Sequence, residues 1–246
     1  MTTSRRTRFS KDAELTPAFI LHTRKYRDTS LIAEILTERD GRVAAVIRGA
    51  RANKKKSGVV QAFTPLLVSY VGRGELKTVT KIDTGTVARL VGENLLIGLY
   101  VNELLVRLLG KYEPVGSLFA AYQDLVLNLI SGNPSSGVLR GFELNLLSEL
   151  GYEVTFDLDA STGLAVEADQ YYRYVPDEGF HSLIQDTSNA TYKGEYLLAI
   201  ADGDFDTPAV DNCAKKIVRA SLAVLLGDKP LKSREMFELY QSRTRN

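Results

Sequence analysis

The hydrophobic residues of this chain change their spacing near residue 90, and that change limits which folds the sequence can adopt. Between residues 17 and 84 apolar residues recur at every second position, as Val43, Ala45 and Ile47 do. A period of two is that of a β-strand. Beyond residue 90 the spacing becomes three and four, as in Ile97, Val101, Leu104, Leu105 and Leu108. That spacing marks one face of an α-helix. The sequence therefore predicts an α+β chain with its strands first and its helices second.

Turn residues divide the first part into short strands. Glu38–Gly41 and Gly72–Gly74 are typical turn sequences, and the segments between them are rich in Leu, Ile and Val. Five such strands between residues 17 and 84, joined by short connections, predict a small closed β-barrel. A five-stranded Greek-key barrel of the OB type is the natural candidate, and an SH3-like barrel remains the alternative.

Start and stop signals divide the second part into helices. Gly132 and Gly151 end two apolar stripes. Thr207 followed by Pro208 is a good helix start, because threonine caps the first turn and proline fits the first helical position. Residues 152–190 lose the helical period and gain Gly, Asp and Tyr. We expect a helical bundle with a small irregular insert that is held by packing, its tyrosines included.

These changes predict three regions along the chain. They are a flexible basic N-terminal tail at 1–16, an OB-fold domain at 17–88, and a helical domain at 89–246 with its insert at about 152–190. No apolar run approaches the roughly 18 residues of a membrane span. No apolar segment follows the N-terminal arginines as it would in a secretory signal. We therefore expect a cytoplasmic protein with no membrane partner.

Residues suited to metal or covalent chemistry are few. Cys213 is the single cysteine, which rules out an internal disulfide and a cysteine-based zinc site. Its place on an apolar stripe predicts a buried side chain. His22 and His181 lie far apart, outside any metal-spacing motif. The acidic stretch 202–206 begins like a calcium loop but lacks the required glycine and bidentate glutamate. We expect no metal, no cofactor and no catalytic residue.

Charge is divided into blocks that the near-zero total conceals. Residues 1–89 hold 18 Lys and Arg against 8 Asp and Glu, residues 90–211 hold 5 against 19, and residues 212–246 hold 8 against 3. Such a division favours separate surfaces for separate partners, one of them a polyanion. A solvated loop remains the plain alternative for the densest cationic run, Arg48–Lys56.

The cations of the first block fall on several neighbouring strands and turns of the predicted barrel. They are Arg24, Lys25, Arg27, Arg42, Arg48, Arg51, Lys54, Lys55, Lys56, Arg73, Lys77 and Lys81. This pattern suits a groove that follows a sugar–phosphate backbone. Tyr26, Phe63 and Tyr70 are candidates for stacking on bases, and a place in the core is the alternative for each. We expect binding with little sequence preference and, for roughly five neutralised phosphates, a slope of log affinity against log salt near −4 to −5.

An ordered set of segments resembles one bacterial family. The segments are Ala18–Arg24, Gly41–Arg51, Phe63–Leu67, Gly72–Thr78, Tyr100–Leu105, Leu139–Leu144, Leu150–Tyr152 and Lys229–Arg234. Together they are similar to the recombination and repair protein family RecO, and they leave only the first sixteen residues uncovered. The resemblance implies an OB barrel followed by a helical domain, in agreement with the periodicity.

The resemblance also implies a non-catalytic activity. Members of the family bind single- and double-stranded DNA and anneal complementary strands. With the partner RecR, they help RecA recombinase replace the single-stranded-DNA-binding protein SSB in the RecFOR pathway. This implies a cytoplasmic, nucleoid-associated protein with no small-molecule substrate. Some members hold zinc with four cysteines after Leu-Gly-Tyr, but residues 152–180 here contain none, so we expect no zinc.

Family members bind the acidic, Phe-ending tail of SSB on the helical domain. Arg140 and Arg107 are rare cations in the acidic block, and an arginine beside an apolar groove can hold a terminal carboxylate. An ordinary pairing of each arginine with a helical glutamate is the alternative. Two other function classes stay open on the residues alone. One is an OB-fold RNA-binding protein acting in translation or RNA maturation, and the other is an enzyme with dispersed carboxylates.

Overall fold

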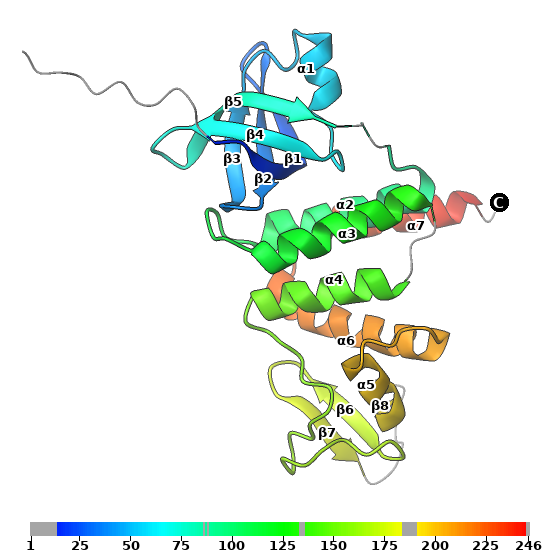
Figure 1. Cartoon of the computed structure of the whole chain (residues 1–246). Helices are drawn as coiled ribbons and strands as arrows, with labels where there is room; N and C mark the ends of the chain where they lie inside the picture. The colour runs from blue at the N-terminus through cyan, green and yellow to red at the C-terminus, as the bar shows by residue number, and fades with distance from the viewer. Residues whose placement is uncertain (1–13, 86, 88, 133–135, 184–190, 245–246) are drawn as a thin grey trace, which may run out of the picture. The chain divides into compact units, whose positions relative to one another are not determined.

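The chain forms two compact units. The computed structural model describes residues 14–85, 87, 89–132, 136–183 and 191–244. One unit contains the chain up to residue 88 together with Lys111–Pro114, and the other contains residues 89–110 and 115 onward. Figure 1 shows the elements of each. Residues 1–13 of the predicted basic tail lie outside the described residues.

The first unit is a closed five-stranded barrel, as predicted. Its strands are β1 (Thr16–Tyr26), β2 (Ser30–Thr37), β3 (Gly41–Ile47), β4 (Leu66–Val71) and β5 (Leu76–Thr84). They close in the order β1-β2-β3-β5-β4, with β3 and β5 parallel and every other pair antiparallel. This arrangement is OB-like and confirms the predicted fold class.

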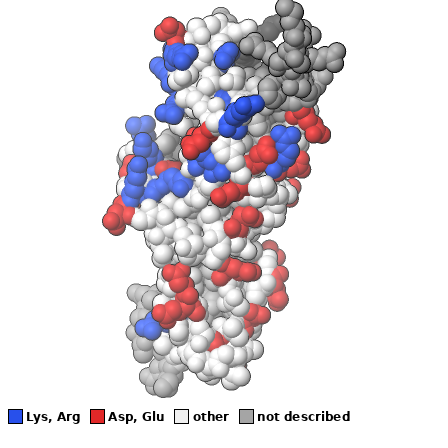
Figure 2. Space-filling model, turned by 90° about the vertical axis from the view of Figure 1, so that its left-hand side faces the viewer, with Lys and Arg blue, Asp and Glu red and all other residues white. Residues whose placement is uncertain are grey.

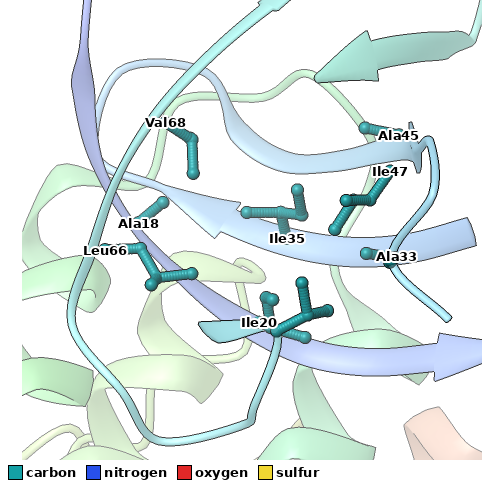
Figure 3. Packing of buried hydrophobic residues seen from close by; sticks show 10 residues of the cluster. Ala18, Ile20, Ala33, Ile35, Ala45, Ile47, Leu66 and Val68 are labelled. Carbon is teal, nitrogen blue, oxygen red and sulfur yellow. The ribbon is translucent and has the colours of Figure 1, made fainter. Parts of the chain in front are cut away.

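The barrel interior is aliphatic, which explains the period of two. Figure 3 shows Ile20, Ile35 and Ile47 meeting inside it with Leu66 and Val68. All five side chains are almost completely buried. Because successive residues of a strand point to opposite faces, these positions leave the alternate side chains outside the barrel.

The segment Lys111–Pro114 runs beside the start of β3 and pairs with it at Arg42. The backbone N–H of Tyr112 donates to the carbonyl of Arg42 at 3.0 Å. A Cβ on Gly41 would lie 1.8 Å from the carbonyl oxygen of Glu113, and the φ angle of Gly41 is +62°. Only glycine fits this contact and this backbone conformation.

The cationic run between β3 and β4 is partly helical rather than a simple loop. Residues Lys54–Val59 form the short helix α1. An uninterrupted cationic run has no apolar period, so the periodicity that revealed the longer helices could not reveal this one.

The second unit is a helical bundle. Its helices are α2 (Gly92–Leu108), α3 (Gly116–Ser131), α4 (Ser136–Glu149), α5 (Gly194–Ala201), α6 (Pro208–Leu226) and α7 (Lys232–Thr244). Helix α2 packs on α7, α3 on α4, and α4 on α6. The predicted cap of α6 is confirmed, because the hydroxyl of Thr207 accepts from the N–H of Val210 at 3.3 Å.

The insert is more regular than predicted. Strands β6 (Tyr171–Val175), β7 (Gly179–Leu183) and β8 (Thr191–Lys193) form an antiparallel sheet in the order β7-β6-β8. The Tyr174 and Phe180 rings lie 5.0 Å apart between centroids. Tyr172 and Phe180 share a buried cluster with Cys213, and burial raises the pKa of that thiol to about 12. The insert is therefore held by aromatic packing, as predicted, and Cys213 is buried.

Candidate nucleic-acid interface

Half of the predicted phosphate-binding cations gather at one end of the barrel. We call this the α1 end, and its cations are Arg24, Lys25, Arg27, Arg48, Arg51 and Lys81. Lys25 pairs with Leu31 on β2, and Leu31 pairs with Ile47, the last residue of β3. Arg48 and Lys81 line the same surface cavity. The ladder register and the shared cavity thus bring cations from β1, β3 and β5 together.

Most cations of the α1 end are open to solvent. Arg24, Lys25, Arg27 and Arg48 are exposed. Lys81 forms an ion pair with Asp83 at 3.0 Å, but its side chain is 60% exposed. An ion pair between exposed side chains contributes little free energy, so it leaves Lys81 able to contact a phosphate. This surface offers several positive charges to a polyanion.

Arg51 has a structural task at the same end. Its Nη1 donates to the carbonyls of Arg27 and Asp28, at 3.3 Å and 3.0 Å. Its backbone N–H donates to the carbonyl of Thr29 at 2.9 Å. Arg51 therefore fixes the β1–β2 turn, where Arg27 has a φ of +48°.

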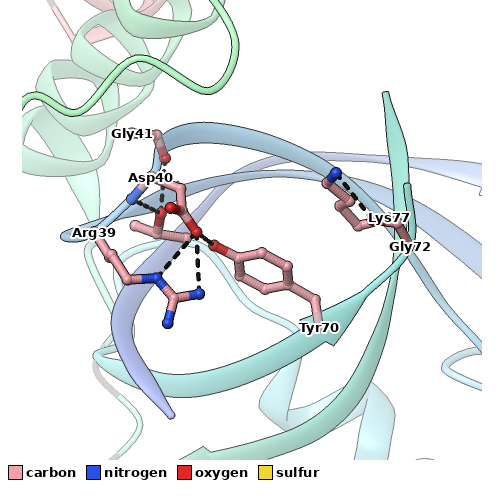
Figure 4. A network of polar contacts seen from close by, with 7 residues as sticks. Arg39, Asp40, Gly41, Tyr70, Gly72 and Lys77 are labelled. Atoms are coloured by element: carbon pink, nitrogen blue, oxygen red, sulfur yellow. Dashed lines mark hydrogen bonds and ion pairs between the residues drawn. The ribbon is translucent and has the colours of Figure 1, made fainter. Parts of the chain in front are cut away.

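The three other predicted cations whose side chains are described lie elsewhere or are paired. Arg42 donates to Glu34 at 3.2 Å, with only 14% of its side chain exposed. Lys77 donates to the carbonyl of Gly72 at 3.1 Å (Figure 4). Its Nζ also lies 4.7 Å from the Tyr112 ring centroid. Arg73 is exposed in the β4–β5 turn. These three do not belong to the α1 end.

A bulge in the barrel breaks one predicted alignment. Lys77, Val79 and Lys81 should share a face of β5 if the strand is regular. The β4–β5 ladder instead shifts its register between Ser69 and Tyr70. Val79 and Ile82, three residues apart, consequently both pack against the core. A bulge inserts one extra residue and reverses the alternation beyond it, which separates Lys81 from the face of Lys77.

Two of the aromatic candidates have other roles. Phe63 is buried and cannot stack on a base. The hydroxyl of Tyr70 donates to Asp40, which also accepts from Arg39 (Figure 4). Burial alone would raise the pKa of Asp40, but the bonds from Tyr70 and Arg39 lower it below its ordinary value. Tyr26 lies at the α1 end, where the guanidinium of Arg27 lies over its ring with Cζ 5.2 Å from the ring centroid.

Three predicted cations can be placed only by their backbone. Lys54, Lys55 and Lys56 form the first residues of α1, and their side chains lie outside the described part of the structure. Helix α1 begins three residues after Arg51 in the sequence, so it starts close to the α1 end.

The helical unit contains an apolar pocket of about 360 Å³. Its apolar walls come from α2, α3, α4 and α7, through Leu96, Ile97, Leu125, Leu129, Leu139 and Phe237. Its cations are Arg140 on α4, Lys215 and Arg219 on α6, and Arg234 on α7. We call it the α2–α7 pocket. Its apolar walls and cationic lining suit a ligand that is both apolar and anionic.

Arg140 lies in this pocket, but its guanidinium is engaged. Its Nη1 donates to Glu143, and its Nε donates to Asp211 at 3.0 Å. The hydroxyl of Tyr100 donates to Glu143 at 2.6 Å. Burial raises the pKa of Glu143, although the Arg140 charge and the Tyr100 hydrogen bond oppose that rise. Arg140 mainly neutralises a buried carboxylate.

Arg107 does not line the α2–α7 pocket. It donates to the carbonyls of Leu226 and Pro230, at 2.8 Å and 3.1 Å. These contacts satisfy carbonyls at and beyond the end of α6, where the helix leaves acceptors without internal partners. The arginine therefore connects α2 to the turn before α7.

The sequence reasoning missed the other pocket cations. Burial, followed by the positive charges of Arg219 and Arg140, lowers the pKa of Lys215. The like charges of Arg219 and Arg140 add to the effect of burial, and an anion bound nearby would oppose both. The spacing of four between Lys215 and Arg219 was the available signal, because it places both on one face of α6.

Comparison with known proteins agrees with this architecture. The sequence matches the family models "Recombination protein O N terminal" over residues 13–86 and "Recombination protein O C terminal" over residues 89–235. The DNA repair protein RecO of Pseudomonas entomophila is 44% identical over 90% of this chain and 96% of its own length. That of Actinobacillus succinogenes is 43% identical over 89% and 93%. That of Coxiella burnetii strain RSA 493 is 41% identical over 92% and 99%.

The chain belongs to the RecO family. As a member of the RecO family it is a protein of DNA repair and recombination. On the face shown in Figure 2, most Lys and Arg lie in the upper half, with some Asp and Glu among them, whereas the few charged side chains of the lower half are mainly Asp and Glu. Within the described ranges, no three His, Cys, Asp or Glu residues are grouped so as to hold a metal ion. The described helices include none that is long and apolar enough to cross a bilayer.

Proposed function

We propose that this RecO family member binds single- and double-stranded DNA without sequence preference through the α1 end of its barrel. It then anneals complementary strands and, with RecR, helps RecA load on SSB-coated DNA. The observation that carries the proposal is the gathering of exposed cations from β1, β3 and β5 at one end of an OB-like barrel. Contacts to phosphates carry no sequence information, so the binding is general.

Annealing follows from the same surface. Two complementary strands repel each other through their phosphates, and a cationic surface reduces that repulsion while the bases stay free to pair. We expect the full-length protein to raise the annealing rate of two labelled complementary strands, followed by fluorescence transfer, and the rise to disappear at high salt. Annealing no faster than that of protein-free strands at low salt would contradict the proposal.

The α2–α7 pocket is the proposed site for the SSB tail. An acidic tail that ends in phenylalanine matches the apolar walls of the pocket and its lining of Lys215, Arg219 and Arg234. Because Arg140 is engaged by Glu143 and Asp211, we assign the main contacts with the tail to the other three cations. This placement differs from the sequence-based choice of Arg140 and Arg107.

Charge reversal on α6 tests the tail site. Arg219→Glu places a negative charge in the pocket lining and is expected to weaken binding of an acidic, Phe-ending peptide by about tenfold or more. Fluorescence anisotropy of the labelled peptide measures this. Lys216→Glu is the matched control, since Lys216 is exposed on α6 but does not line the pocket. Equal losses in both variants would place the tail elsewhere.

A further inference from the structure

The pairing of β3 with β5 is short and stops before the α1 end. The parallel ladder between β3 and β5 extends only from Ala44–Leu76 to Val46–Thr78. Beyond it, the register shift of the β4–β5 ladder falls opposite Thr80. A bulge bends its strand, and past Val46–Thr78 no ladder pair of described residues joins β3 to β5, which leaves a gap between them. A surface cavity of about 220 Å³ occupies the gap.

The cavity has aliphatic walls and a cationic rim. Its walls are Ile47 on β3, Val59 on α1, and Val79 and Ile82 on β5. The rim includes the exposed residues Arg48 and Lys81. Thr80 also lines it, with its hydroxyl bonded to the carbonyl of Ser69 at 3.0 Å. The cavity thus combines an apolar interior with two positive charges at its mouth.

We propose that this cavity holds one unpaired nucleobase of a bound single strand. The proposal rests on the proposed DNA-binding function and adds a contact that only single strands can make. The flat faces of a base are apolar and suit the aliphatic walls, while Arg48 and Lys81 hold the flanking phosphates. Aliphatic walls can contact any of the bases, so the cavity adds no sequence preference.

A base of duplex DNA cannot enter this cavity unless its base pair opens. A paired base is stacked on its neighbours, and extracting it costs a few kcal/mol. The exposed cations serve both forms of DNA, whereas the cavity distinguishes them. Charge complementarity at the rim also selects a base attached to a phosphate backbone over an apolar peptide.

An abasic strand separates the base contact from the phosphate contacts. The probes are a labelled oligothymidine and its fully abasic counterpart with the same number of phosphates, both bound to the full-length protein at one salt concentration. We expect the base-bearing strand to bind about fivefold more tightly, the effect of removing about 40 Å² of apolar base surface from water. Val59→Phe fills the cavity, and the two strands should then bind equally, at the affinity of the abasic strand.

The matched control is Val71→Phe, which enlarges an exposed valine on β4 away from the cavity. It should keep the fivefold difference. If Val59→Phe does not fold by circular dichroism, Thr80→Phe fills the cavity from β5 instead. Equal binding of both strands to the unaltered protein would contradict base binding in the cavity but would leave the proposed DNA binding standing. Binding of neither strand overturns the proposed function as well.

Discussion

Reversing three exposed cations of the α1 end is expected to abolish most DNA binding. The combined variant Arg24→Glu, Arg27→Glu and Arg48→Glu removes three phosphate contacts and adds three charges that repel the backbone. We expect the affinity for a single strand to fall by on the order of a hundredfold or more near physiological salt. Annealing should fall with it. Fluorescence anisotropy of a labelled oligonucleotide measures the first effect, and strand pairing measures the second.

The matched control changes the net charge equally on the helical unit. Lys216, Lys232 and Arg243 are exposed, and reversing all three gives the same total charge as the barrel variant. A general electrostatic effect would weaken binding equally in both variants. A local interface predicts a much smaller loss in the control, and comparable losses would contradict the assignment to the α1 end.

Removing Arg140 is expected to lower the free energy of unfolding by several kcal/mol. Glu143 is only 2% exposed and accepts from both Arg140 and Tyr100. Arg140→Leu leaves this carboxylate buried without its cation, and loss of one partner from such a pair costs about 3–5 kcal/mol. Denaturant unfolding at neutral pH measures the change. The double variant Arg140→Leu with Glu143→Leu should recover most of it, because two apolar residues leave no buried charge.

The cost of Arg140→Leu should depend on pH in a fixed direction. Arg140→Leu removes the largest effect that opposes burial, so the pKa of Glu143 should rise further above its ordinary value of 4.5. The folded state then holds a proton that the unfolded state releases, so stability falls as the pH rises above about 4.5. The difference from the unaltered protein should therefore be smallest in acid and largest at neutral pH. A difference that stays constant would mean that Glu143 is not the cause.

The architecture could be predicted because it depends on local patterns. The alternation of Val43, Ala45 and Ile47 marked a strand, and Thr207 with Pro208 marked the start of α6. Both are confirmed. They could be predicted because periodicity and capping involve residues close together in the chain.

The details of the site could not be predicted in the same way. Arg42 and Glu34 meet only because β2 and β3 pair in one register. The separation of Lys81 from Lys77 depends on a bulge that no residue type announces. Cations on α6 and α7 meet apolar residues of α2 more than a hundred positions away. Each is a consequence of tertiary packing, which the composition of a segment does not specify.

The salt dependence of single-strand binding tests the central claim most directly. Affinities of the full-length protein and of the Arg24→Glu, Arg27→Glu, Arg48→Glu variant would be measured across a series of salt concentrations. We expect a slope of log affinity against log salt near −4 to −5 for the unaltered protein, and a slope shallower by about three for the variant. A slope near zero, or an equal slope in the two proteins, would contradict phosphate binding by the α1 end.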